Sequence, residues 1–167
     1  MRHSRSVTSS KNDKIEHVGV VGAGLMGSGI AEVCARAGCD VMVLEVSADA
    51  CERGRARVVG SLDRAVRSGK LSEPDRDAAF GRLAFTTDYS DLANSDLVVE
   101  AVIEDEKLKT SVFRELDRAV ISPEAILASN TSSIPIMKLG IATQRPEHVI
   151  GIHFFNPVPV LRLVELV

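Results

Sequence analysis

Residues 18–31 read VGVVGAGLMGSGIA, an apolar run that leads into a glycine-rich turn. The run at 18–21 predicts a buried parallel strand, and apolar residues at helical spacing after the turn predict a helix. Gly22, Gly24 and Gly27 form the pattern G-x-G-x-x-G. In that pattern the first glycine permits a tight turn, the second lets a pyrophosphate approach the backbone, and the third lets helix and strand pack closely. Because a helix N-terminus also presents free N–H groups and a positive dipole end, the stretch predicts binding of a dinucleotide.

The residues that follow this stretch agree with that interpretation. Gly38 stands where a helix would end, and the apolar residues at 40–44 predict a second buried strand. Glu45 comes next, 23 residues after Gly22, close to the spacing of the carboxylate that holds a ribose 2′-hydroxyl. A carboxylate would repel the 2′-phosphate of NADP, and no arginine follows it, so the sequence predicts NAD. The alternative is a strand–helix–strand unit without a ligand.

Composition limits the class of protein. The chain has 167 residues, of which 45% are hydrophobic and 26% charged, as is typical of one soluble globular domain. A net charge of −3 argues against a general nucleic-acid binder. No apolar run approaches the roughly 18 residues that span a membrane. The three cysteines are odd in number and lack C-x-x-C spacing, so the sequence predicts neither disulfides nor a metal site, and a reducing cytoplasm fits best.

The first fourteen residues differ from the rest of the chain. Residues 1–14 are polar and lack the apolar core of a secretory signal. Their serine- and arginine-rich composition faintly resembles a transit peptide, but they have no apolar face. We therefore predict a disordered tail at 1–14 and a single domain at 15–167.

A pair of helices interrupts the alternation of strand and helix. Apolar residues at helical spacing predict a long helix at 48–68, and Ser72 is the expected N-cap of a second helix that ends near Phe80. This hairpin, at about 48–80, is too long for a simple crossover and should project from the sheet. Its basic residues are Arg53, Arg55, Arg57, Arg64, Arg67 and Lys70. Each alone is an ordinary solvated side chain, but together they could meet a polyphosphate tail.

The remaining apolar runs predict further strands. They lie at 83–86, 96–102, 125–129, 148–153 and 160–167. Strands that alternate with helices in this way predict an α/β fold, a doubly wound Rossmann-type sheet with a projecting helical hairpin.

Polar residues follow two of these strands, at the edge of the sheet where ligands bind in open α/β folds. Glu104 and Lys109 come after the strand at 96–102 and are placed to touch a cofactor, although a surface ion pair is the more common use of such a pair. The small polar residues at 130–133 could hold a ligand or cap the helix expected at 135–141. Capping is the more common use.

His153 stands at the carboxyl end of its predicted strand. Glu165 comes twelve residues later, in the last predicted strand. If the two strands turn back on one another, the carboxylate can accept a hydrogen bond from one imidazole nitrogen and raise the basicity of the other. Because removal of hydride from an alcohol carbon needs a base for the hydroxyl proton, a nicotinamide site with a His–Glu pair indicates dehydrogenation of an alcohol.

Four segments together resemble one known family. They are VGAGLMGSGIA at 21–31, SNTSS at 129–133, GIHFFNPVPV at 151–160 and LVELV at 163–167. These segments resemble the N-terminal, NAD-binding domain of the L-3-hydroxyacyl-CoA dehydrogenases, in particular members that act on 3-hydroxybutyryl-CoA. The resemblance covers about residues 15–167, and the third segment is the most specific.

The resemblance implies roles for individual residues. His153 would be the catalytic base, Glu165 its partner, and Ser132 would lie beside the substrate oxygen and the nicotinamide. The expected cofactor-binding residues are Gly22, Ala23, Gly24, Leu25, Met26 and Gly27 of the turn, with Glu45, Glu104, Lys109, Ser132 and Asn156. The hairpin is where family members meet coenzyme A, which implicates Ser61 and Lys70, together with Ser132, in substrate binding.

The implied reaction is NAD-dependent oxidation of a short-chain (3S)-3-hydroxyacyl-CoA to the 3-oxoacyl-CoA. Two alternatives stay open. A gulonate-type sugar-acid dehydrogenase would keep the histidine and the Asn-Pro pair, but Phe154 and Phe155 argue against it. A nucleotide-binding module without catalysis is the other, because family members continue into an all-helical C-terminal domain that is absent from this chain.

That absent domain supplies a catalytic asparagine, half of the acyl pocket and the dimer interface in the family. The resemblance therefore implies that NAD binding survives better than turnover and that a homodimer forms only with the C-terminal domain. It also predicts an exposed apolar surface on this chain, where the helices of that domain would pack.

Overall fold

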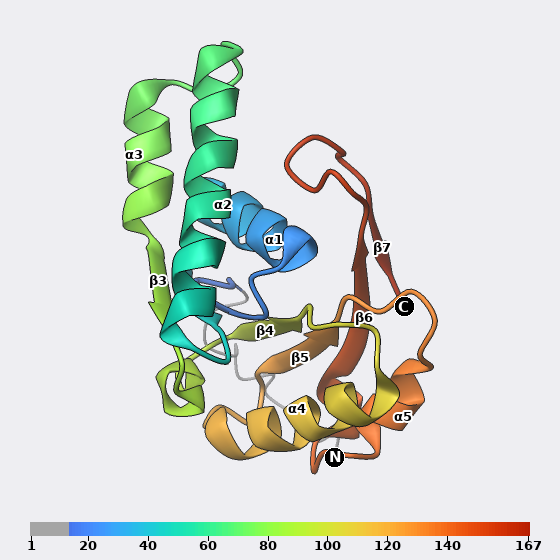
Figure 1. The fold of residues 1–167 in the computed structure, drawn as a ribbon. Helices are drawn as coiled ribbons and strands as arrows, with labels where there is room; N and C mark the ends of the chain where they lie inside the picture. Colours follow the sequence, from blue (N-terminus) through green and yellow to red (C-terminus); the bar gives the residue numbers. More distant parts are fainter. Residues whose placement is uncertain (1–13) are drawn as a thin grey trace, which may run out of the picture.

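The computed structural model describes residues 14–167, in which a single seven-stranded sheet carries helices on both faces (Figure 1). The strand order is β3-β2-β1-β4-β5-β6-β7. The strands are β1 His17–Val21, β2 Asp40–Leu44, β3 Leu83–Thr86, β4 Leu97–Glu100, β5 Ile126–Ser129, β6 Val149–Phe154 and β7 Val164–Leu166. All neighbouring strands pair parallel except β6 and β7, which pair antiparallel. The predicted doubly wound Rossmann-type sheet is confirmed.

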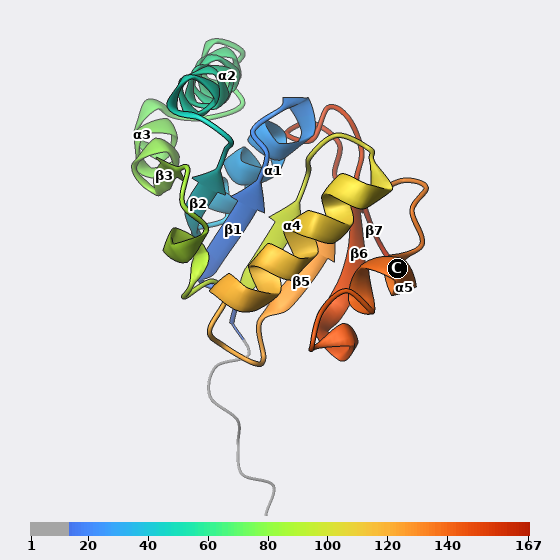
Figure 2. The same ribbon diagram turned by 60° about the horizontal axis from the view of Figure 1, so that its bottom comes forward.

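The helices divide between the two faces of the sheet. They are α1 Leu25–Arg36, α2 Ala48–Arg67, α3 Glu73–Gly81, α4 Glu106–Ala119 and α5 Ile136–Gly140, with 3-10 turns at Tyr89–Leu92 and Pro146–His148. One core cluster joins α1, α2 and α3 to the sheet through residues such as Ile30 and Leu62. A second joins α4 and α5 through Phe113, Leu116 and Leu139 (Figure 2). Burial of apolar side chains on both faces explains why the central strands are apolar throughout.

Helices α2 and α3 form the predicted hairpin, which extends beyond the sheet in Figure 1. The side chain of Ser47 accepts from the backbone N–H of Ala50 at 3.2 Å and caps α2. Ser72 caps α3 as expected, by accepting from the N–H of Asp75 at 3.1 Å. Gly69 has a φ of 71°, the left-handed conformation that suits glycine in the turn between the helices. Local residue preferences therefore account for the hairpin.

The prediction of a final strand at 160–167 is wrong in its length. β7 spans only Val164–Leu166, and the chain before it forms a tight turn in which the N–H groups of Val160 and Leu161 each donate to the carbonyl of Pro157 at 3.0 Å. Prolines 157 and 159 have no N–H to give to a sheet. The turn nevertheless brings β7 back against β6, as the His–Glu hypothesis requires.

The described residues leave the N-terminal tail untested and contain no membrane-spanning helix. The predicted tail at 1–14 lies outside them except for Lys14, so it stays a prediction. Within residues 14–167, no helix combines the length and the apolar character needed to cross a membrane.

Candidate functional site

The glycine-rich turn joins β1 to α1, and the backbone at its start packs closely against the first turn of the helix. Gly22 has a φ of 92°, so it takes the left-handed conformation that makes the tight turn. A Cβ atom on Gly27 would lie 1.7 Å from the carbonyl oxygen of Gly22, so any side chain there would separate helix from strand. A Cβ on Gly24 would meet nothing within 4 Å, which leaves its backbone open to a ligand. Gly22 and Gly27 thus have the conformation and the close packing that the sequence predicted, and the open space at Gly24 is compatible with the predicted approach of a pyrophosphate.

The peptide groups of Ala23 are held by three side chains. Its N–H donates to Glu45 Oε1 at 2.5 Å, and its carbonyl oxygen accepts from Ser28 Oγ at 2.8 Å and from Arg57 Nη1 at 3.1 Å. Glu45 comes directly after β2, as predicted, and is only partly buried. Its carboxylate therefore lies against the turn, where a ribose would follow a bound pyrophosphate.

The other two turn residues differ in exposure. Leu25 begins α1 and its side chain is largely exposed, whereas Met26 is half-buried and packs against the core on the helical-hairpin side of the sheet. Sequence reasoning did not find the contacts of Ser28 and Arg57 with the turn. Arg57 was grouped only with the basic face of the hairpin, and spacing could not show that its guanidinium contacts the glycine-rich turn.

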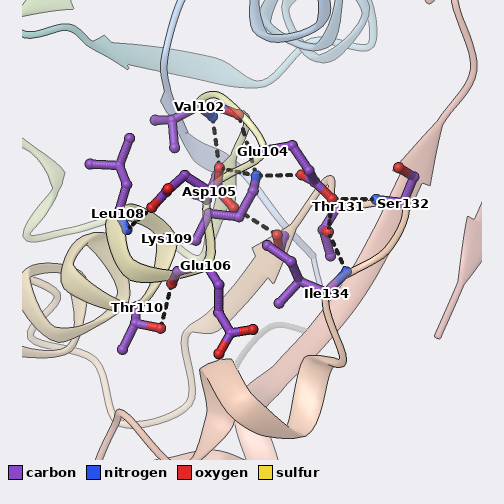
Figure 3. Close-up of polar contacts among 12 residues, drawn as sticks. Val102, Glu104, Asp105, Glu106, Leu108, Lys109, Thr110, Thr131, Ser132 and Ile134 are labelled. Carbon is purple, nitrogen blue, oxygen red and sulfur yellow. Dashed lines mark hydrogen bonds and ion pairs between the residues drawn. The ribbon is translucent and has the colours of Figure 1, made fainter.

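Glu104 accepts hydrogen bonds from the loop that follows β5. One of its oxygens, Oε1, accepts from the hydroxyl of Thr131 and from the N–H of Ser132 at 3.2 Å (Figure 3). The same oxygen accepts from both the N–H and the hydroxyl of Ser133, at 3.3 and 2.9 Å. Partial burial opposes the negative charge. The hydroxyls of Thr131 and Ser133 and the ammonium of Lys109 outweigh that effect and lower the pKa of Glu104 from 4.5 to about 2. Glu104 is therefore a fixed anion.

Lys109 lies beneath this carboxylate and not on the surface. Its side chain is 1% exposed, and Nζ lies 2.7 Å from Glu100 Oε1 and 3.3 Å from Glu104 Oε2. The alternative of a surface ion pair between Glu104 and Lys109 is therefore wrong, because Lys109 is buried and has a second carboxylate partner. Sequence reasoning missed Glu100, although a charged residue within the apolar run at 96–102 was the signal that could have found it.

The loop at 130–133 does not cap the next helix. The N-cap of α5 is Pro135, which offers no side-chain hydrogen bond. Instead, Thr131 Oγ1 accepts from the N–H of Ile134 at 3.0 Å, and Asn130 Oδ1 accepts from the N–H of Phe154 at 2.9 Å. The side chain of Ser132 is exposed, and its hydroxyl has no hydrogen-bond partner among the residues that the structure describes. That hydroxyl is free to meet a ligand.

His153 and Glu165 face each other across β6 and β7. They are directly paired in the antiparallel register, and His153 Nδ1 lies 3.5 Å from Glu165 Oε2. The imidazole is 26% exposed and its ring centroid lies 4.5 Å from that of Phe155, so it is partly shielded from solvent. The structure thus brings together the two residues that the sequence proposed as a pair.

A pocket of about 620 Å³ lies between α1, α2 and the chain that follows β6. Of the three residues predicted for the substrate, Ser61 and Lys70 line it and Ser132 does not. Asn156, which was predicted for the cofactor, also lines it. Two arginines of the hairpin, Arg57 and Arg64, contribute to the same wall. The pocket therefore offers several cations and a hydroxyl to a single ligand.

Comparison with known proteins agrees with this geometry. The family model described as 3-hydroxyacyl-CoA dehydrogenase, NAD binding domain, matches residues 17–167. The chain belongs to the 3-hydroxyacyl-CoA dehydrogenase family. NAD is therefore the cofactor of this domain, in keeping with the open backbone at Gly24 and the carboxylate of Glu45 beside the turn.

Individual members of the family are similar over nearly the whole chain. A 3-hydroxybutyryl-CoA dehydrogenase of Mycobacterium tuberculosis is 61% identical over 156 residues, which cover 93% of this chain and 54% of that protein. The crystal structure of M. tuberculosis FadB2 has a TM-score of 0.91 at 61% identity, over 92% of this chain and 54% of that one. The structure of (S)-3-hydroxybutyryl-CoA dehydrogenase PaaH1 from Ralstonia eutropha has a TM-score of 0.88 at 46% identity, with the same coverage. The chain thus spans about half the length of these 3-hydroxyacyl-CoA dehydrogenases.

Proposed function

We propose that this chain contributes the NAD site and the catalytic base of an enzyme that oxidises (3S)-3-hydroxyacyl-CoA to 3-oxoacyl-CoA, with short-chain substrates such as 3-hydroxybutyryl-CoA. The observation that carries the proposal is the pairing of His153 with Glu165 at the edge of the sheet where the loop of Ser132 also lies. The name of the M. tuberculosis relative supports the choice of substrate.

The proposed roles follow from the geometry of the His–Glu pair. Glu165 lies on the Nδ1 side of His153, so Nδ1 carries the proton and Nε2 is the base that takes the proton of the substrate hydroxyl. As the imidazole becomes positively charged, the carboxylate of Glu165 stabilises it. The free hydroxyl of Ser132 donates to the substrate oxygen and orients it. When bound, NAD supplies the acceptor for the hydride that leaves C3.

Coenzyme A is proposed to occupy the pocket between α1 and the hairpin. Lys70 and Arg64 line that pocket with Ser61, and phosphate groups are recognised by just such cations and hydroxyl donors. This is the support for assigning Ser61 and Lys70 to the substrate. We further propose that the protein is cytoplasmic and that it forms a homodimer through the C-terminal domain found in members of the family.

The test is the loss of NADH absorbance when the chain is mixed with acetoacetyl-CoA, the reverse of the proposed reaction. Oxidation of NADH by the wild-type chain should disappear in His153→Ala, while NADH affinity changes little, because the imidazole is not placed in the phosphate-binding turn. His148→Ala is the matched control, since His148 precedes the opposite end of β6. That variant should oxidise NADH like the wild type.

Three results would contradict the proposal or part of it. Turnover retained in His153→Ala would remove the role of His153. Oxidation of gulonate by NAD in place of reduction of acetoacetyl-CoA would favour the sugar-acid alternative. NADH binding without any acyl-CoA turnover would identify the chain as a nucleotide-binding module, whose chemistry needs residues that this chain does not contain.

A further inference from the structure

Glu100 is a buried carboxylate to which neither the sequence motifs nor the proposed mechanism gives a role. It is the last residue of β4 and its side chain is 0% exposed. A charge in such a place is costly unless every oxygen has a donor. Oε1 accepts from the N–H of Val102 and from Lys109 Nζ, both at 2.7 Å, and Oε2 accepts from Ser129 Oγ at 2.6 Å. The carboxylate is thus fully satisfied.

Lys109 connects this carboxylate to the loop that carries Ser132. Its ammonium has three protons, and three oxygens surround it: Glu100 Oε1 at 2.7 Å, Glu104 Oε2 at 3.3 Å and the carbonyl of Val102 at 3.3 Å (Figure 3). The ammonium thus has three protein oxygens within 3.3 Å. It acts as a buried link between two carboxylates.

Two chains of contacts connect Glu100 to the loop at 130–133. Through Lys109 it fixes Glu104, whose Oε1 receives the N–H groups of Ser132 and Ser133. Through Ser129 it holds the end of β5, which the chain continues directly into Asn130. Both routes end at the loop whose Ser132 hydroxyl would orient the substrate.

We propose that Glu100 is a positioning residue for the dehydrogenation, which sets the place of the 130–133 loop through Lys109 and Glu104. The importance of that loop for the reaction rests on the proposed function. The positioning of the loop by Glu100 rests only on the contacts described above. It can therefore be correct even if the proposed function is wrong, and the reverse also holds. The competing possibility is that the Glu100–Lys109 pair contributes to stability alone.

A single and a double substitution separate these possibilities. Glu100→Gln leaves Lys109 with less compensation for its buried charge and should lower the thermal unfolding midpoint. Glu100→Gln combined with Lys109→Met removes both charges at similar side-chain volume, so the midpoint should return close to that of the wild type. The loop should not recover, because Glu104 has still lost its cation.

Amide hydrogen exchange and NADH binding report on the loop without an activity assay. In the double variant, amide hydrogen exchange at Ser132 and Ser133 should be faster than in the wild type by about tenfold, the loss expected for hydrogen bonds to a weakened charged acceptor. NADH affinity should fall by a similar factor of about ten, since the same loop borders the cofactor site. Exchange in α1 and β1 should not change. Glu100→Gln should show the faster exchange at Ser132 and Ser133 as well, because Lys109 remains but loses the partner that holds it. If Glu100→Gln does not fold, Glu100→Asp takes its place, because it keeps the charge and withdraws the carboxylate from Lys109 by one carbon.

A matched control lies at the other end of α4. Asp117 pairs with Arg145 Nε at 2.9 Å in a similarly shielded ion pair. Asp117→Asn should lower the unfolding midpoint and leave the exchange of Ser132 and Ser133 and the NADH affinity unchanged. The proposal is overturned if the double variant regains the wild-type midpoint together with wild-type exchange and NADH affinity, or if Asp117→Asn disturbs the loop as much.

Discussion

Glu104 shows how a single residue can order a loop by its charge. Its carboxylate receives donors from three successive residues, at 131–133, and contacts the buried ammonium of Lys109. A hydroxyl or amide side chain in its place could not accept from so many donors at once. The order of the loop therefore depends on the ionised form of this carboxyl.

The protonation of Glu104 should make the stability of the fold pH-dependent. Its pKa is lowered from 4.5 to about 2, so the unfolded chain takes up the proton first as the pH falls. The stabilisation is complete above the ordinary value of 4.5 and is lost as the pH falls toward about 2. Thermal unfolding should show wild type and Glu104→Gln far apart at about pH 6 and close together only at about pH 2. A constant separation across this range would contradict the prediction.

Sequence reasoning named the candidate site residues but not how they contact one another. The turn glycines, Glu45 and His153 were recognisable because each stands at a fixed distance from a motif or a strand end. Lys109 was assigned to the cofactor, yet its burial against Glu100 depends on how α4 packs on β4, and no local pattern contains that information. Long-range polar pairs of this kind had to be seen in the structure.

At the scale of elements, the approach of α1 to β1 determines the shape of the phosphate-binding turn. Gly22 and Gly27 are in direct contact, with no room for even one carbon atom between them. The helix N-terminus can point at the turn only while this contact is kept.

Gly27→Ala should therefore disturb two elements at once. The added methyl group would lie 1.7 Å from the Gly22 oxygen, and the strain should cost roughly 1–3 kcal/mol or more of unfolding free energy. NADH affinity should fall with it, as the helix N-terminus moves away from the turn. Gly81→Ala is the control, because a Cβ at the end of α3 would meet nothing within 4 Å. Urea unfolding and fluorescence titration with NADH measure the two effects, and equal behaviour of the two variants would refute the argument.

Elements with local signals were predicted well, and the last strand was not. The hairpin of α2 and α3 carries its own caps at Ser47 and Ser72, so the sequence contains the information for it. β7 has no such signal. An apolar run at 160–167 is typical of a strand, but whether its first residues pair or turn depends on the prolines at 157 and 159 and on where β6 ends.

At the scale of the whole molecule, one surface is unusually apolar. Six large hydrophobic residues close to the end of the chain are exposed: Val160, Leu161, Leu163, Val164, Leu166 and Val167. The family resemblance predicts an exposed apolar surface on this chain, and these exposed side chains are the candidates for it. Where exposed apolar side chains form a large contiguous patch, the patch marks an interaction site more often than a solvated face.

This apolar surface should bind a solvatochromic dye such as anilinonaphthalene sulfonate. Leu163→Glu with Leu166→Glu should reduce the dye fluorescence several-fold, because two charges replace exposed apolar side chains of this surface. Ile121→Glu with Val46→Glu is the matched control, since both residues are highly exposed but follow α4 and β2, away from β7. Its dye fluorescence should stay near that of the wild type. Equal losses in the two double variants would show that the dye does not report on this surface.

The strand order has a consequence for the protein as it is being made. β1 leaves the ribosome first, yet one of its two neighbours is β4, and about 75 residues separate Val21 from Leu97. At about 5–20 residues per second, translation of that interval takes roughly 4–15 s. During this time one edge of an apolar strand has no native partner, which is the condition under which nascent chains associate wrongly. The strand that leads into the glycine-rich turn thus waits longer for its second neighbour than any other strand of the sheet.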